Sequence, residues 1–294
     1  MFLSKHHGLG NDFLVVLDDR QGHPVAIDPA LAIRLCHRRT GIGADGLIHG
    51  IRPTDEQRAA GIDVVMRLIN SDGSPAEMSG NGIRCLGQAV AQAQERWEGT
   101  ITVLTDAGLR PLEITPGPDA ATVMVSVGMG EPGQGPHIPA PVGEFLTGRF
   151  ATVDMGNPHL VVVVDDPATV DLTTEGGWLE AQFPGGMNIE YIAPTADGTA
   201  LALRVWERGA GVTNACGTGA CAAAHQARRW GLVGDQVTVS MPGGDARVVL
   251  EADGTATLIG PSVHIAEVVV AAEAGGPSTS AGLTAALASA EGRP

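Results

Sequence analysis

Two stretches of the chain end in the same arrangement, a small residue with a nucleophilic side chain directly before Gly-x-Gly. Ser79 precedes the Gly-Asn-Gly of positions 80–82, and Cys216 precedes the Gly-Thr-Gly of positions 217–219, which lies 137 residues later. An Ala-rich run follows each. The first turn of a helix leaves backbone N–H groups without partners and carries partial positive charge. Each motif therefore predicts an anion-binding helix end with a reactive side chain beside it.

The chemistry expected of such a pair is proton transfer at a carbon next to a carboxylate. Two helix ends that face each other would hold one carboxylate, with Ser79 on one face of the ligand and Cys216 on the other. Donors aimed at the carboxylate oxygens stabilise the charge that forms when the α proton leaves. A helix N-terminus also lowers the pKa of a cysteine, so we expect Cys216 to be available as a thiolate. Two bases on opposite faces permit inversion without a cofactor.

The sequence lacks the residues that pyridoxal, nucleotide or metal chemistry would need. Lys5 is the only lysine, and at the N-terminus it is a poor candidate for a pyridoxal Schiff base. Neither Gly-x-Gly extends into a dinucleotide or phosphate-loop motif. The other cysteines show no metal-ligand spacing, so we expect no metal and place Cys36, Cys85 and Cys221 in the core. The alternative for the paired residues is structural, with Ser79 only a helix cap and Cys216 only a buried thiol.

The composition narrows the class of partner. The net charge of −15 argues against a nucleic-acid ligand, which needs a basic face. No apolar run approaches the roughly 18 residues that span a bilayer, so no membrane is expected. Without a secretory pattern we expect a cytoplasmic protein with reduced thiols. At 294 residues the chain exceeds the usual size of one domain.

A second repeat indicates that the chain is internally duplicated. Gly10-Asn11 and Gly156-Asn157, 146 residues apart, each stand beside a Leu-Val-Val run. We expect an N-terminal half at 1–118, a C-terminal half at 119–261, a return to the first half at 262–272 and a poorly ordered tail at 273–294. Patterning predicts strands at 14–17, 64–69, 101–104, 122–127, 160–164, 201–206, 237–240, 247–250 and 265–271, helices at 30–38, 82–96 and 219–230, and a linker at 128–141.

These residues resemble those of the diaminopimelate epimerase family, cofactor-independent two-base amino-acid epimerases. The resemblance extends to about residue 270 and is strongest at Ala-Cys-Gly-Thr-Gly-Ala-Cys (215–221). It implies an α/β (α+β) fold with two pseudo-symmetric domains, each a curved mixed sheet around a central helix, and an active site in the cleft between them. It also implies a homodimer, and conversion of LL- to meso-diaminopimelate for lysine and peptidoglycan synthesis. The other matching segments are His-Gly-Leu-Gly-Asn-Asp-Phe (7–13), Thr-Gly-Ile-Gly-Ala-Asp (40–45), Asn-Ser-Asp-Gly (70–73), Gly-Asn-Pro-His (156–159) and Glu-Arg-Gly-Ala-Gly (207–211).

The resemblance also implies roles for individual residues. Cys216 would be one catalytic base, Glu207 would pair with the substrate ammonium, and His159 would orient the reacting centre. The backbone N–H groups of Gly80, Asn81, Gly217 and Thr218 would hold the carboxylate. The distal amino-acid end of the substrate would be bound by Arg208 together with Asn70, Asn157 and Asn188. Asn11 also falls at a ligand-binding position.

Ser79 stands where the family has its second cysteine. A thiolate is accessible near neutral pH, whereas an alkoxide is not, so a two-thiol epimerase would lose most of its turnover after this change. Three explanations remain for the serine. It would be an engineered substitution, a natural residue of a slower epimerase, or a sign that the protein catalyses a different reaction of the same superfamily. The alternatives are therefore a related racemase, a hydroxyproline epimerase or dehydratase, and a carboxylate-binding protein that lacks full catalysis. The distal clamp favours diaminopimelate, because a ring substrate would not need it.

Overall fold

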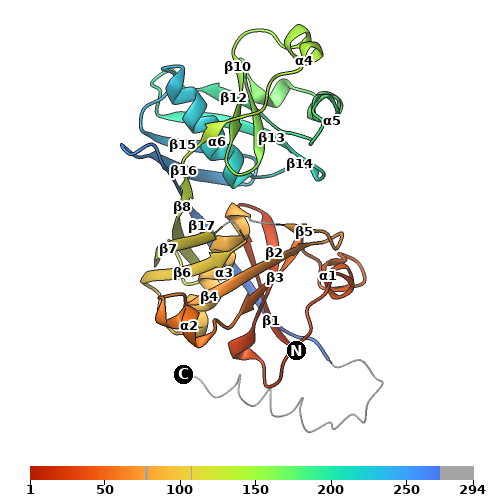
Figure 1. Cartoon of the computed structure of the whole chain (residues 1–294), viewed down its shortest axis with the longest axis vertical. Coiled ribbons are helices and arrows are strands. Elements are labelled where there is room, and N and C mark those ends of the chain that lie inside the picture. Colours follow the sequence, from red (N-terminus) through yellow and green to blue (C-terminus); the bar gives the residue numbers. More distant parts are fainter. Residues whose placement is uncertain (77–78, 107, 272–294) are drawn as a thin grey trace.

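The computed structural model describes residues 1–76, 79–106 and 108–271, and its elements form two lobes stacked along the long axis (Figure 1). The expected tail at 273–294 lies outside the described residues. The lower lobe in Figure 1 contains β1 (Phe2–Gly8), β2 (Asn11–Leu17), α1 (Pro29–Cys36), β3 (Gly46–Ile51), α2 (Asp55–Ala59), β4 (Val64–Asn70), β5 (Pro75–Ala76), α3 (Gly80–Ala93), β6 (Gly99–Thr105) and β7 (Gly108–Pro116).

The upper lobe repeats this order of elements except for α2, which has no counterpart between β12 and β13. It contains β10 (Phe150–Asp154), β11 (Pro158–Val163), α5 (Leu172–Gln182), β12 (Asn188–Pro194), β13 (Ala200–Glu207), β14 (Gly211–Thr213), α6 (Gly217–Arg229), β15 (Gln236–Met241) and β16 (Gly244–Leu250), together with β9 (Gly133–Gln134) and α4 (Ala140–Phe145). Two long strands, β8 (Thr122–Gly130) and β17 (Ala256–Val269), run between the lobes and pair antiparallel with each other (Figure 1).

Strand pairing shows the internal symmetry directly. In the lower lobe β2 and β3 are parallel, β3 and β4 antiparallel, and β4 and β6 parallel. In the upper lobe the same pattern holds for β11 and β12, β12 and β13, and β13 and β15. The chain therefore has the α+β fold of two pseudo-symmetric mixed sheets that was expected from the sequence, and the two sheets are continuous with each other through β17, which pairs with β16, β8 and β1.

Each sheet curves around one buried helix. All described positions of α3 from Gly80 to Ala91 are buried, and α6 is buried along most of its length. A helix that is buried on every side must be enclosed by other elements. The apolar residues around α3 and α6 form one continuous cluster. Separate apolar clusters lie under α1 and under α4 and α5, on the outer faces of the sheets.

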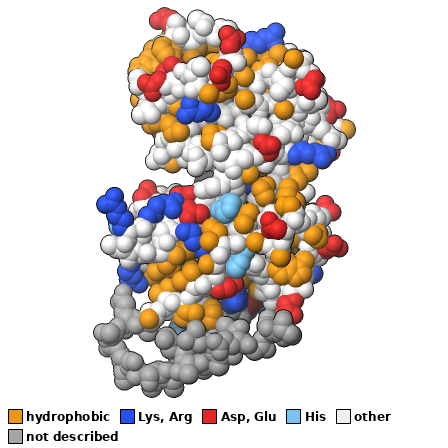
Figure 2. All heavy atoms as spheres, turned by 180° about the vertical axis from the view of Figure 1, so that it is seen from behind, with side chains coloured by type: hydrophobic (Ala, Val, Ile, Leu, Met, Phe, Trp, Pro, Cys, Tyr) orange, Lys and Arg blue, Asp and Glu red, His pale blue; other side chains and the backbone are white. Residues whose placement is uncertain are grey.

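The double covering of the sheets explains the sequence pattern. Six of the seven residues of β2 are buried because α3 lies against one face and α1 against the other. Its apolar run is therefore continuous instead of alternating, as is usual for a strand covered on both faces. Seen from behind, acidic and basic side chains are interspersed on the surface, and a notch separates the two lobes on one side (Figure 2).

Most of the expected elements are present with small shifts of their ends. The expected strand at 265–271 is the end of β17, and it pairs with β1 from Phe2 opposite Val269 to His7 opposite Val263. The linker predicted at 128–141 is confirmed only in part: 131–132 and 135–139 have no regular structure, whereas 128–130 belong to β8, Gly133 and Gln134 form β9, and α4 begins at Ala140. None of the helices among the described residues is long and apolar enough to cross a bilayer.

Candidate active site

The two paired motifs form the N-termini of the two central helices. Ser79 caps α3 with φ −130° and ψ 123°, and its Oγ accepts a hydrogen bond from the Gly82 N–H at 3.0 Å. Cys216 caps α6 with φ −128° and ψ 118°, and its Sγ accepts from the Gly219 N–H at 3.4 Å. The helices begin two residues earlier than predicted, because the nucleophile-type residue itself is the cap.

The two helix ends lie directly against each other. A Cβ added to Gly217 would lie 3.1 Å from the Cα of Gly80, and a Cβ added to Gly80 would lie 3.2 Å from the Cα of Gly217. Leu258 of β17 closes the same space. Only glycine permits so close an approach of two backbones. The two copies of the sequence repeat are therefore in contact in space through Gly80 and Gly217, which directly follow Ser79 and Cys216.

The electrostatic surroundings of Cys216 differ from the expectation. The side chain is 4% exposed. Burial and the carboxylates of Glu207 and Glu190 raise the pKa of Cys216 well above its ordinary value, and the bonds from Thr218 and Gly219 lower it by less. The expected lowering of this pKa is wrong, because one helix end does not offset the loss of solvent and two neighbouring carboxylates.

Glu207 lies at the end of β13, where it hydrogen-bonds the hydroxyl of Thr213. Burial raises the pKa of Glu207, while Thr213 and the Cys216 side chain act to lower it. The carboxyl group of Glu207 and the thiol of Cys216 therefore interact, because each is among the causes that shift the pKa of the other. Glu207 is thus placed to influence Cys216, in addition to any contact with a ligand.

A chain of hydrogen bonds runs beneath the first turn of α6. His159 Nδ1 pairs with Glu190 Oε1 at 2.6 Å, and its Nε2 lies 3.0 Å from Asn157 Oδ1. Asn157 Nδ2 donates to the Thr218 hydroxyl at 3.4 Å. His159 and Glu190 are both fully buried. This chain fixes the ring of His159 next to the segment that carries Cys216.

Glu190 is a site residue that the sequence reasoning missed. Its Oε2 has no hydrogen-bond partner among the described residues, and a Cβ on Gly219 would lie 2.6 Å from its Oε1. The signal was available, since Glu190 is an acidic residue inside the otherwise mainly apolar strand β12. Buried carboxylates almost always have a paired or functional reason.

Asn81 joins the two halves at the site. Its Nδ2 donates to Asn11 Oδ1 at 3.2 Å and to the carbonyl of Ala215 at 3.1 Å, directly before Cys216. Asn11 in turn donates to Asp45 Oδ2 at 2.7 Å. Asn81 Oδ1 accepts a hydrogen bond from Nη2 of Arg84, a second residue that was not predicted from the sequence.

The residues expected to bind the distal end of a substrate fall into separate groups. Asn188 accepts from the Arg208 backbone N–H at 2.9 Å and donates to the Pro158 carbonyl at 2.8 Å. The Arg208 guanidinium donates to Gly185 at 3.1 Å. Asn70 belongs to the lower lobe, and among the described residues its side chain bonds Ser74 and none of the other expected ligands.

The remaining cysteines behave as core residues. Cys85 and Cys221 are fully buried within α3 and α6, and burial raises the pKa of each to about 12. Burial also raises the pKa of Cys36 to about 11. Their expected placement in the core is confirmed.

Comparison with known proteins decides the family. The family model of diaminopimelate epimerase matches residues 3–133 and 151–265. The chain is 39% identical over 281 residues to the diaminopimelate epimerase of Desulfitobacterium hafniense, covering 90% of this chain and 96% of that protein. It is 40% identical over 279 residues to the diaminopimelate epimerase of Synechocystis sp., covering 89% of this chain and 96% of that protein. The chain belongs to the diaminopimelate epimerase family.

Solved structures share the fold of this diaminopimelate epimerase family member at much lower identity. A predicted epimerase from Pseudomonas aeruginosa aligns with a TM-score of 0.68 at 16% identity, over 92% of this chain and 99% of that chain. A hydroxyproline epimerase from Agrobacterium vitis aligns with a TM-score of 0.62, also at 16% identity, over 91% of each chain. At these identities the likeness extends to the arrangement of two lobes alone.

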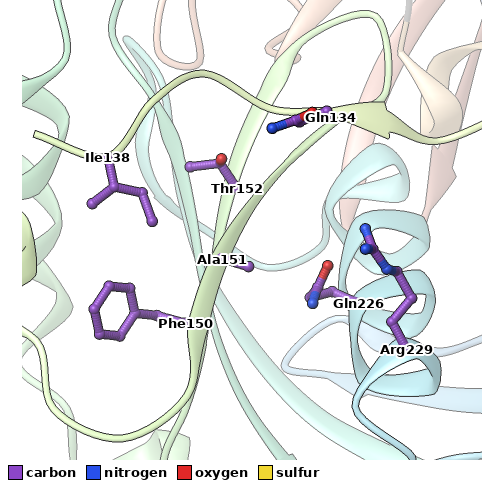
Figure 3. Close-up of a pocket in the computed structure, with 7 residues that line it drawn as sticks. All are labelled: Gln134, Ile138, Phe150, Ala151, Thr152, Gln226 and Arg229. Atoms are coloured by element: carbon purple, nitrogen blue, oxygen red, sulfur yellow. The ribbon is translucent and has the colours of Figure 1, made fainter.

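A cavity of about 360 Å³ lies elsewhere in the upper lobe of this diaminopimelate epimerase family member. It is found near the C-terminal end of α6, the opposite end of the helix from Cys216 (Figure 3). Its lining contains none of the expected site residues and consists of Gln134, Ile138, Phe150, Ala151, Thr152, Gln226 and Arg229. Within the described part of the chain, no group of three or more His, Cys, Asp or Glu side chains is arranged to hold a metal ion.

Proposed function

We propose that this protein interconverts LL- and meso-diaminopimelate by proton transfer at the α carbon between the two capped helix ends. One observation supports this proposal above all: Ser79 and Cys216 have the same capping geometry on two helices that meet at Gly80 and Gly217. The proposal includes a division into halves at 1–118 and 119–261 with 262–272 returning to the first, a homodimer and a cytoplasmic location.

The carboxylate next to the reacting carbon would lie where the helix ends meet. Gly80, Asn81, Gly217 and Thr218 occupy the first two positions of α3 and α6, where backbone N–H groups have no intrahelical acceptor. No described residue accepts a hydrogen bond from these four N–H groups. Four convergent donors and two helix dipoles suit a carboxylate whose negative charge increases as the α proton leaves.

Proton removal by Cys216 would be coupled to binding. Glu207 and Glu190 oppose a thiolate at Cys216, because two negative charges already lie close to it. A substrate ammonium next to Glu207 would offset part of that charge and allow the thiol proton to move to Glu207. The thiolate would then remove the α proton. His159, fixed between Glu190 and Asn157, would hold its orientation throughout.

Arg208, Asn70, Asn157 and Asn188 would bind the distal amino-acid end of the substrate. Asn188 already holds the backbone of Arg208, which places this guanidinium on the loop after β13. Asn70 and Asn11 would contribute from the lower lobe. Their separation into groups on both lobes suits a ligand that touches both halves of the protein.

Ser79 limits the second half of the reaction. A neutral hydroxyl can donate a proton to the carbanion. The alkoxide that results is unfavourable at neutral pH, because the pKa of a hydroxyl lies far above 7. We therefore expect proton exchange with solvent at the side facing Cys216 to be faster than inversion. Related racemisation, hydroxyproline epimerisation or dehydration, and simple carboxylate binding are the competing outcomes.

The experiment is to incubate the protein with LL-diaminopimelate in deuterated water and follow solvent exchange and inversion by NMR. We expect exchange without matched inversion in the native chain, and a large gain of inversion after Ser79→Cys. Cys221→Ser is the matched control, since this thiol lies on the same helix as Cys216 but away from its end. Absence of exchange in both the native chain and the Ser79→Cys variant would refute the proposal, and turnover of hydroxyproline instead would replace it.

A further inference from the structure

Arg84 is a fully buried cation for which the proposed reaction has so far given no role. It lies in the second turn of α3 and is 0% exposed. Among the described residues no carboxylate pairs with it, and its bonds go to neutral oxygens. A buried charge without a counterion destabilises the folded state, so we expect Arg84 to have a function that offsets this cost.

The fold makes room for this guanidinium from two sides. A Cβ on Gly8, at the end of β1, would lie 3.1 Å from Nη2 of Arg84. A Cβ on Gly260, in β17, would lie 3.2 Å from Cζ and from Nε. A side chain at either position would therefore be in tight contact with the guanidinium, which would have to shift by a few tenths of an ångström. The space is therefore shaped for an arginine at this place.

The bonds of Arg84 converge on the first turn of α3. Nη1 donates to the Gly80 carbonyl at 3.0 Å, Nη2 donates to Asn81 Oδ1 at 2.7 Å, and Nε donates to the Pro261 carbonyl at 3.3 Å. In a trans peptide the carbonyl and the following N–H point in opposite directions. Fixing the Gly80 carbonyl therefore fixes the direction of the Asn81 N–H, which is one of the donors of the carboxylate site.

The second bond extends the effect to the other half. With its Oδ1 held by Arg84, the Asn81 amide must present Nδ2 to Asn11 and to the Ala215 carbonyl. Ala215 directly precedes Cys216. Arg84 is thus connected through one side chain to both helix ends.

Arg84 has no counterpart in the second copy of the repeat. The position 137 residues after Arg84 is Cys221, so only the lower-lobe copy carries the cation. Arg84 nevertheless acts on both copies, since its charge lowers the pKa of Cys221 in α6 as well as that of Cys85 in α3, although burial raises both. Burial lowers the pKa of Arg84 itself to about 10, so it stays charged at neutral pH.

We propose that Arg84 is a positioning residue of the carboxylate site, which orients the Gly80–Asn81 peptide and the Asn81 amide and supplies the only buried arginine charge behind the paired helix ends in the described part of the chain. The identity of the bound carboxylate rests on the proposed function. The role of Arg84 in orienting the two helix ends does not depend on it. The developing carbanion charge would be stabilised mainly in the transition state, so the effect falls on kcat more than on KM.

The test compares Arg84→Met and Arg84→Lys with Gln88→Met in the full chain. Gln88 lies one turn further along α3 and is also 0% exposed. Its Nε2 donates to the Ala121 carbonyl, and its Oε1 accepts from the Ser262 hydroxyl and lies 2.9 Å from Nδ1 of His6, so its bonds are as buried as those of Arg84 but do not involve the first turn of α3. With diaminopimelate in deuterated water, we expect Arg84→Met to lower kcat for α-proton exchange by about 10- to 100-fold, Arg84→Lys to restore part of it, and Gln88→Met to change it little. Equal losses for Arg84→Met and Gln88→Met would overturn the inference.

A second measurement separates this inference from the proposed function. Amide hydrogen exchange followed by NMR should become faster at residues 80–83 and 215–218 in Arg84→Met but not in Gln88→Met. If the parent protein does not act on diaminopimelate, the proposed function fails and this measurement still decides the role of Arg84. Unchanged exchange at both segments would overturn it.

A double-mutant cycle covers the case in which Arg84→Met does not fold. If Arg84 acts through Asn81, Arg84→Lys should have little further effect on amide exchange at 215–218 once Asn81→Ala is present. Fully additive effects would contradict a path through Asn81.

Discussion

The contact between the two helix ends gives the sharpest prediction, since it depends on two glycines that a single methyl group would disturb. In Gly217→Ala the new Cβ would lie 2.9 Å from Leu258 Cδ2 and 3.1 Å from the Gly80 Cα. The leucine methyl can move, but the backbone of α3 cannot move without shifting the helix. An ordinary contact would need the two helix ends to separate by roughly 0.5 Å, given the usual carbon–carbon separation of about 3.5–4.0 Å.

The size of the effect follows from that displacement. Overpacking of a close contact costs about 1–3 kcal/mol, and we expect the low end because the shift is small. Alanine would otherwise stabilise a helix by up to about 1 kcal/mol over glycine, so any net loss reports the contact itself. A misplacement of about 1 Å can lower a rate by about 100-fold, so half of that predicts about a tenfold loss of kcat/KM.

The assay uses the Ser79→Cys background, in which inversion is expected to be measurable, together with thermal unfolding. Gly128→Ala is the matched control, because Gly128 lies in β8 and a Cβ there would meet nothing within 4 Å. The reasoning is refuted if Gly217→Ala matches Gly128→Ala in both kcat/KM and stability, since the helix ends would then not be in contact in solution.

Two further predictions follow from the buried titratable groups. Burial lowers the pKa of His6 from 6.5 to about 4. The unfolded chain therefore binds this proton first, and the free energy of unfolding should fall by up to about 3 kcal/mol as the pH drops from about 6.5 to 4, and His6→Gln should flatten that slope in urea titrations. A slope unchanged by His6→Gln would contradict this. Glu190 raises the pKa of Cys216, so Glu190→Gln should move the pH profile of Cys216 alkylation, followed by mass spectrometry with iodoacetamide, to lower pH. A shift to higher pH, or none, would show that the carboxylate does not act on the thiol.

The local sequence was sufficient to predict the paired helix ends. A cap needs only a side chain that can accept a hydrogen bond from an N–H three residues later, and Ser79 and Cys216 meet that condition within their own segments. The repeat in the sequence likewise predicted two similar halves, and strand pairing repeats accordingly. The apolar runs marked part of the strands, among them β2, β4, β11 and β13, whereas β1, β7, β10 and β12 were not predicted.

Local patterning failed where distant segments decide the environment. The predicted linker at 128–141 was read from its glycines and prolines, yet β8 is stabilised by pairing with β7 and with β17, a strand more than a hundred residues away. Strand β3 was missed because Gly46, His49 and Gly50 interrupt its apolar pattern. Its pairing with β2 and β4 compensates for that weak local preference.

The sequence by itself determined which residues stand at the two helix ends, because capping and helix periodicity are properties of short segments. Only the tertiary structure decided that these ends touch, that Cys216 has a raised pKa, and that Glu190 and Arg84 belong to the site. Burial and charge are summed over groups that the fold brings together from β12, β13, α3 and α6. These pKa shifts therefore cannot be predicted from any short segment of the chain.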